Sequence, residues 1–277
     1  MPHMVLKHGS TLRVGVGGLG AIGMEVVQAL DGGIAGLELS AVSARDTVKA
    51  LERLARLRSK PRLVALNQLA SFADVVVECA PAAVYDQVAT PAIDAGLILV
   101  TMSSGALLSR EDLIAKAKVT GARIIVPSGG ILGLDAIRAA AEGNIHSVTL
   151  ITRKPPHSLA GAPYVVQRNI PLLDFTSAEL IFQGSARDAA QVFPANANVA
   201  ATVSLAGIGP TRTRVEIWVV PGLKENVQEL HVRSDSADFD LKLSSRPLPD
   251  NPRTGSLTPK SVIAALRALT SNLSIGC

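Results

Sequence analysis

The chain has 277 residues, of which 48% are hydrophobic and 18% are charged. This balance excludes a disordered protein, and the length allows one large domain or two ordinary ones. Aromatic residues make up only 3% of the chain and the net charge is only +4, so we expect no nucleic-acid partner.

The cysteine spacing and the lack of long apolar runs exclude further classes of protein. Cys79 and Cys277 lack metal-ligand spacing, so we expect neither a metal site nor a disulfide framework. The chain contains no apolar run of about 18 residues, and the first ten residues lack the apolar centre of a secretion signal. We therefore expect a cytoplasmic protein that does not bind a membrane.

The first half alternates apolar, β-rich runs with longer helical patterns. Such alternation predicts a Rossmann-type, doubly wound parallel sheet, because parallel strands need crossover connections. The expected strands are Thr11–Gly17, Leu37–Ser43, Asp74–Cys79, Ile98–Met102 and Arg123–Val126; the expected helices are Ile22–Leu30, Thr47–Leu57, Ala82–Ala95 and Arg110–Val119.

After Pro127 the pattern changes, and strand-like runs follow one another with few helices between them. This order predicts a second, smaller α/β domain with a mixed or antiparallel sheet. We expect a nucleotide-binding domain over residues 1–127 and a substrate and dimerisation domain over 128–257, with a last helix within 258–277 returning to the first domain. The expected elements are helices Leu134–Glu142 and Pro259–Leu269, and strands His146–Arg153, Val215–Val220, Gln228–Val232 and Asp238–Leu243.

A glycine-rich turn, GVGGLGAIG at residues 15–23, joins the first strand to the first helix. Two registers of G-x-G-x-x-G overlap, and we prefer the later one because its last glycine then lies inside the helix, where close packing requires it. Backbone N–H groups at such a turn bind the pyrophosphate of a dinucleotide. The predicted contacts are Gly18, Leu19, Gly20, Ala21, Ile22 and Gly23.

The end of the second strand bears on the choice of cofactor. An acidic residue about 20 residues after the glycine motif holds the ribose of NAD, but this chain has Ser43 there and Arg45 two positions later. Serine and arginine suit the 2′-phosphate of NADP, whereas Asp46 could serve NAD in a slightly different alignment. We predict NAD or NADP, tilted toward acceptance of NADP.

Polar residues in the second half are candidates for chemistry. His231 lies in a strand-like run and can exchange protons near neutral pH. Arg153 and Lys154 follow one another at a strand end, where cations can pair with carboxylates. Asn196 and Asn198 open an alanine-rich helix and can either cap it or bind an amide.

Several long segments together resemble the L-aspartate dehydrogenase family over nearly the whole chain. They are GLGAIG at 18–23, VVVECA at 75–80, SSGAL at 103–107, VPSGGILGLDAI at 126–137, TRKPP at 152–156, FPANANVAATVSLAG at 193–207, His231 with Asp238 and Phe239, and NPRTGSLTPKSVIAAL at 251–266.

The resemblance implies an NAD(P)-dependent enzyme that oxidises L-aspartate to iminoaspartate, which hydrolyses to oxaloacetate and ammonia, or that runs in reverse. It implies a catalytic role for His231 and dinucleotide contacts at Asn196 and Gly130, the latter in place of the family's usual alanine. It also implies a homodimer and a role such as supplying iminoaspartate to NAD biosynthesis. The alternatives are another amino or imino acid reductase of dihydrodipicolinate-reductase-like architecture and a non-catalytic NAD(P)-sensing protein.

Overall fold

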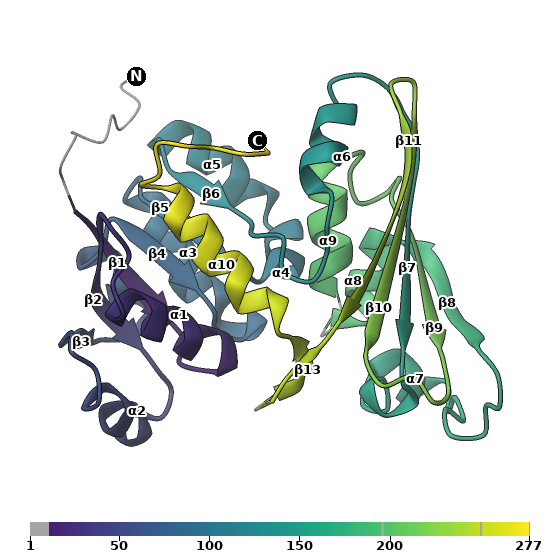
Figure 1. The fold of residues 1–277 in the computed structure, drawn as a ribbon, viewed down its shortest axis with the longest axis horizontal. Coiled ribbons are helices and arrows are strands. Elements are labelled where there is room, and N and C mark those ends of the chain that lie inside the picture. The colour runs from purple at the N-terminus through teal and green to yellow at the C-terminus, as the bar shows by residue number, and fades with distance from the viewer. Residues whose placement is uncertain (1–10, 195–196, 250, 277) are drawn as a thin grey trace. The chain divides into compact units, whose positions relative to one another are not determined.

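The computed structural model describes residues 11–194, 197–249 and 251–276 (Figure 1). The chain forms two compact units. The first unit runs to Pro127 and takes up the later segment Pro259–Ile275. The second unit runs from Ser128 to Thr258 and includes Gly276.

The first unit contains a six-stranded sheet in the order β3-β2-β1-β4-β5-β6, and the paired strands are all parallel. The strands are β1 (Leu12–Gly17), β2 (Leu37–Ser43), β3 (Arg62–Leu63), β4 (Val75–Glu78), β5 (Ile98–Thr101) and β6 (Arg123–Ile125). The helices are α1 (Ala21–Asp31), α2 (Thr47–Leu54), α3 (Tyr85–Asp94), α4 (Ser104–Leu108), α5 (Glu111–Thr120) and α10 (Leu257–Ala268), with the 3₁₀ turns η1 (Leu66–Ser71) and η2 (Ala82–Val84).

Both faces of this sheet are covered, as alternate residues of β4 show. Val75 and Val77 belong to a core with α1, α2 and α10, whereas Val76 belongs to a second core with α3, α4 and α5. All three valines are 0% exposed, which explains why the strand has a continuous apolar run. The prediction of a doubly wound parallel sheet is confirmed.

The second unit contains a five-stranded sheet in the order β11-β10-β7-β9-β8. Only β7 and β9 pair in parallel, so the sheet is mixed, as predicted. The strands are β7 (Ile145–Lys154), β8 (Glu179–Ser185), β9 (Arg214–Val219), β10 (Asn226–Ser234) and β11 (Asp238–Ser245); β12 (Pro247–Leu248) and β13 (Asn251–Gly255) form a separate pair.

One face of this second sheet packs against helices (Figure 1). Leu150, Leu230 and Val232 on this face share an apolar core with residues of the three helices α6, α8 and α9. We call it the inner face and the opposite side of the sheet the outer face. The helices of this unit are α6 (Leu134–Ala140), α7 (Pro163–Gln167), α8 (Ala186–Val192) and α9 (Ala197–Ala206), with the 3₁₀ turn η3 (Pro156–Ser158).

Some elements differ from the sequence-based expectations. The predicted helix Thr47–Leu57 ends at Leu54, and the predicted helix Ala82–Ala95 begins with a 3₁₀ turn before α3. Strand β8 and helix α8 were not predicted. The run that forms β8 lies at the sheet edge with only Phe182 buried, so its sequence lacks the strong alternation of a half-buried strand.

Candidate dinucleotide and substrate site

The glycine-rich turn has the geometry that a dinucleotide cradle requires. β1 ends at Gly17, and Gly18 follows with φ of 100°, a left-handed conformation that favours glycine. A Cβ at Gly23 would lie 1.8 Å from the carbonyl oxygen of Gly18, so only glycine lets α1 begin so close to the strand. A Cβ at Gly20, in contrast, would meet nothing within 4 Å. Open space therefore lies above the backbone at Gly20.

The amino end of α1 is suited to an anion. Gly20 is its N-cap residue and supplies no side-chain hydrogen bond, and the first turn contains no acidic side chain. The N–H groups of Ala21, Ile22 and Gly23 lack an intrahelical acceptor because of their position in the helix. Together with the helix dipole, such groups bind phosphate. The residues present therefore fit the pyrophosphate of a nicotinamide dinucleotide.

The loop after β2 places the exposed Arg45 next to Asp46, whose carboxylate caps a helix. Ser43 is buried at the strand end, and its carbonyl oxygen accepts a hydrogen bond from the N–H of Gly18 at 2.9 Å. Arg45 is exposed. The Asp46 side chain caps α2 by accepting from the N–H of Lys49 at 3.1 Å. Asp46 thus has a structural task, whereas the Arg45 guanidinium faces solvent.

A buried carboxylate, which sequence reasoning missed, lies at the end of β4. Glu78 is 0% exposed, and its oxygens accept hydrogen bonds from Thr101 Oγ1 at 2.7 Å and, at 3.0 Å each, from Ser103 N, Ser103 Oγ and Ala80 N. Burial raises the pKa of Glu78, although these four hydrogen bonds oppose the shift. The available signal was an acidic residue directly after three valines of a buried strand.

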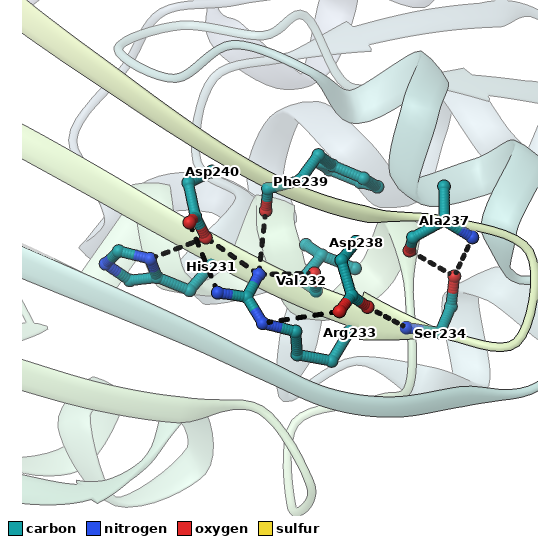
Figure 2. Close-up of polar contacts among 8 residues, drawn as sticks. All are labelled: His231, Val232, Arg233, Ser234, Ala237, Asp238, Phe239 and Asp240. Atoms are coloured by element: carbon teal, nitrogen blue, oxygen red, sulfur yellow. Dashed lines mark hydrogen bonds and ion pairs between the residues drawn. The ribbon is translucent and has the colours of Figure 1, made fainter.

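His231 lies on β10, opposite Thr149 of β7. Its Nδ1 is 2.7 Å from Asp240 Oδ1 on β11, and Arg233 donates to both oxygens of the same carboxylate at 2.8 and 3.2 Å (Figure 2). Hydrogen bonds lower the pKa of Asp240 to about 2; the one from Arg233 has the largest effect, and the one from His231 the next largest. Asp240 is therefore ionised over the whole neutral range and can orient the imidazole. The His231 side chain is 37% exposed.

The structure places Arg153 and Lys154 on opposite faces of the second sheet. Arg153 is on the outer face, where its guanidinium donates to Glu229 at 3.2 Å and lies 5.2 Å from the centre of the Trp218 ring. Lys154 is on the inner face and only 7% exposed. Burial lowers the pKa of Lys154 to about 8. Throughout the described part of the chain, no carboxylate lies within salt-bridge distance of Lys154.

Further polar groups accompany Lys154 on the inner face. Thr152 and Gln228 lie directly opposite one another and are both buried, and the Thr152 hydroxyl donates to the Gln228 side chain at 2.7 Å. His231 belongs to the other face, because side chains alternate along a strand. The candidate residues of this sheet therefore form two sets, which lie on its two faces.

The remaining predicted contacts lie at the start of the second unit and around α9. Gly130 is half-buried, and a Cβ there would lie 3.7 Å from Val199 on α9. Asn198 is exposed in the first turn of the same helix. Asn196 lies outside the described residues.

In residues 11–194, 197–249 and 251–276, no three His, Cys, Asp or Glu side chains are grouped so that they could hold a metal ion. Within the same residues, no helix has the length and the apolar character needed to cross a membrane.

Comparisons with known proteins agree over nearly the whole chain. Residues 18–127 match the family model described as "Homoserine dehydrogenase, NAD binding domain", and residues 135–269 match "Aspartate dehydrogenase, C-terminal". The first unit is thus a nicotinamide-dinucleotide-binding domain.

Full-length relatives carry the same description. An L-aspartate dehydrogenase of Bradyrhizobium diazoefficiens is 46% identical, covering 96% of this chain and 95% of that protein. One from Methanosarcina acetivorans is 38% identical, covering 96% and 99%. The crystal structure of aspartate dehydrogenase from Thermotoga maritima superimposes with a TM-score of 0.73 at 25% identity, covering 96% of this chain and 99% of that chain. This chain therefore belongs to the L-aspartate dehydrogenase family.

Proposed function

We propose that this protein is an L-aspartate dehydrogenase, which oxidises L-aspartate with NAD⁺ or NADP⁺ to iminoaspartate and also catalyses the reductive amination of oxaloacetate with ammonia. The observation that carries the proposal is membership of the family along the full chain, at 46% identity to the Bradyrhizobium protein. The open backbone at Gly20 supports it, because it leaves room for a dinucleotide.

Binding of the cofactor and proton transfer would fall to different residues. The bound nicotinamide supplies the hydride chemistry. The amino end of α1 and the turn at Gly18 would hold the pyrophosphate, with Gly130 and Asn196 as further proposed contacts. Since the substrate amine must be uncharged before oxidation, a base is needed. We assign this proton transfer to His231, which Asp240 orients at 2.7 Å.

The carboxylates of aspartate need cationic or hydrogen-bonding partners. Arg153 and Asn198 remain proposed contacts, but Arg153 already has Glu229 as a partner. Lys154 is the stronger candidate on charge, because its buried ammonium has no carboxylate partner within the described residues. Its burial also makes it the second candidate for the proton transfer, from the opposite face of the sheet.

The decisive assay follows NADH and NADPH oxidation by absorbance, with oxaloacetate and ammonia supplied together and each omitted in turn. Consumption only when both are present is the expected result and establishes reductive amination. No consumption with either cofactor, under conditions where binding of the cofactor is detected directly, would contradict the assigned reaction and favour a dinucleotide-sensing protein. Consumption with other oxo acids and ammonia instead would favour a related reductase.

We also propose that the enzyme accepts NADP, because Arg45 is exposed and Asp46 is engaged in capping α2. The family resemblance further supports a homodimer, formed through the second unit, that works in the cytoplasm and can supply iminoaspartate to NAD biosynthesis. Sedimentation analysis measures the oligomeric state directly.

A further inference from the structure

Glu78 lies where the nicotinamide half of the cofactor is expected. The sheet order places β4 directly beside β1, and the order of strands reverses between them. Ligands of such sheets bind outside the carboxyl ends of the strands at this switch point, with the adenosine ribose held at the end of β2. Glu78 is the last residue of β4 and therefore belongs to the half of the sheet that receives the nicotinamide nucleoside.

The glycine turn and the segment after Glu78 are in direct contact. A Cβ at Gly18 would lie 2.6 Å from the carbonyl oxygen of Cys79 and 3.0 Å from the N–H nitrogen of Ala80. The N–H of Ala80 in turn donates to a Glu78 oxygen at 3.0 Å. Ala80 thus lies between the backbone of the glycine-rich turn and the Glu78 carboxylate.

Among the residues that the structure describes, no cation forms a salt bridge with the Glu78 carboxylate. Hydrogen bonds from hydroxyl and backbone N–H groups surround the carboxylate, and no basic side chain is among the main influences on its pKa. Two of these donors are the backbone N–H groups of Ala80 and Ser103, which can donate a hydrogen bond but cannot accept one. Each binds a different oxygen of Glu78, so both carboxylate oxygens act as acceptors. A buried charge without a counter-ion is costly, and a cation that binds nearby reduces this cost.

The two forms of the cofactor differ in the charge of the ring. The oxidised nicotinamide is positively charged and the reduced ring is neutral, while the rest of the dinucleotide is the same. We propose that the buried Glu78 carboxylate makes this site favour the oxidised nicotinamide over the reduced one. The inference rests on the proposed dinucleotide site and is independent of the amino acid that the enzyme oxidises.

The test compares dissociation constants for NAD⁺ and NADH in the wild type and in Glu78→Gln. The glutamine keeps an acceptor oxygen for the cluster and removes the charge. At about pH 9, because high pH favours the ionised form of a carboxyl group whose pKa is raised by burial, Glu78→Gln should weaken NAD⁺ binding roughly ten-fold and change NADH binding much less. If Glu78→Gln weakened the binding of NAD⁺ and NADH equally, or changed neither dissociation constant, the inference would be overturned.

Asp74→Asn is the matched control. Asp74 immediately precedes β4, pairs with Arg13 at 2.8 Å, and lies about 13 Å from Glu78 along the strand. This variant removes the same charge at the opposite end of the strand, so the ratio of the two dissociation constants should stay at the wild-type value. A change as large as that in Glu78→Gln would show that net charge alone is responsible, and would contradict the inference.

A second measurement on the wild type applies even where Glu78→Gln does not fold. Over about pH 5 to 9, the preference for NAD⁺ over NADH should rise with pH, since ionisation of Glu78 creates the favourable charge. Cys79 and Tyr85 are the titratable neighbours, and burial raises the pKa of both far enough that they remain neutral here. Asp86 and Arg110 are the other charged groups that act on Tyr85. A flat profile would contradict the inference, whereas a wild type that binds neither form would contradict the dinucleotide site itself.

Discussion

Arg45 is the residue on which cofactor choice should depend. It follows the buried Ser43, is exposed, and stands beside an aspartate that is occupied with capping α2. A guanidinium at this place can pair with the 2′-phosphate of NADP, which NAD lacks. The substitution Arg45→Ala should therefore raise the KM for NADP roughly ten-fold while leaving the KM for NAD nearly unchanged.

Steady-state kinetics with both cofactors test this prediction. Arg56→Ala provides the control, because Arg56 is another exposed arginine and lies beyond the end of α2. Equal effects of Arg45→Ala on both cofactors would show that the guanidinium does not distinguish them.

The glycine motif could be predicted from the sequence, whereas the buried Glu78 could not. The glycine spacing could be recognised because two of its glycines answer local steric requirements, Gly18 through its φ of 100° and Gly23 through its close approach to the Gly18 carbonyl oxygen. Glu78 was missed because its importance depends on Thr101 and Ser103, which come from another strand and the loop after it. A contact between residues more than twenty positions apart leaves no pattern in a single sequence.

At the scale of elements, the second sheet separates two candidate sets. His231 and Arg153 lie on the outer face, whereas Lys154, Thr152 and Gln228 lie on the inner face. The separation of Arg153 from Lys154 could have been foreseen, since neighbouring residues of a strand point to opposite faces. Which face the helices cover depends on tertiary packing and was not readable from the strand itself.

Paired substitutions on the two faces assign the proton transfer. His231→Ala should lower turnover by about 10²- to 10⁴-fold, the usual contribution of a general base, with little change in dinucleotide affinity. Lys154→Met, which keeps the length of the side chain, should mainly raise the KM for oxaloacetate. Turnover numbers and dinucleotide dissociation constants are measured for both variants. Wild-type turnover in His231→Ala, together with a large loss in Lys154→Met, would place the chemistry on the inner face.

The dinucleotide-binding unit is built from two separate parts of the chain. Leu266 of α10 is 0% exposed and packs in the same core as Val26 and Val27 of α1. Leu266→Ala should destabilise this unit by about 2 to 5 kcal/mol, since it leaves a cavity in that core. The exposed neighbour Arg267 provides the control variant Arg267→Ala.

The protein contains a single tryptophan, Trp218, which lies on β9 of the second unit. Urea unfolding can therefore be followed by Trp218 fluorescence for the second unit and by loss of NADH binding for the first. Leu266→Ala should shift the loss of NADH binding to lower urea concentration more than it shifts the Trp218 transition. Identical shifts of both signals would contradict a separate contribution of α10 to the first unit.

The ribosome makes α10 last, although α10 completes the core of the first unit. Domains generally fold as they leave the ribosome, with the N-terminal one first. Here the strands and glycine turn of the nucleotide-binding unit are made early, but α10 begins only at Leu257. A nascent chain that stops before that residue has the complete glycine turn and an incomplete core beneath it. We therefore expect stable dinucleotide binding only once the second unit has also been synthesised, and weaker binding by chains that end before Leu257.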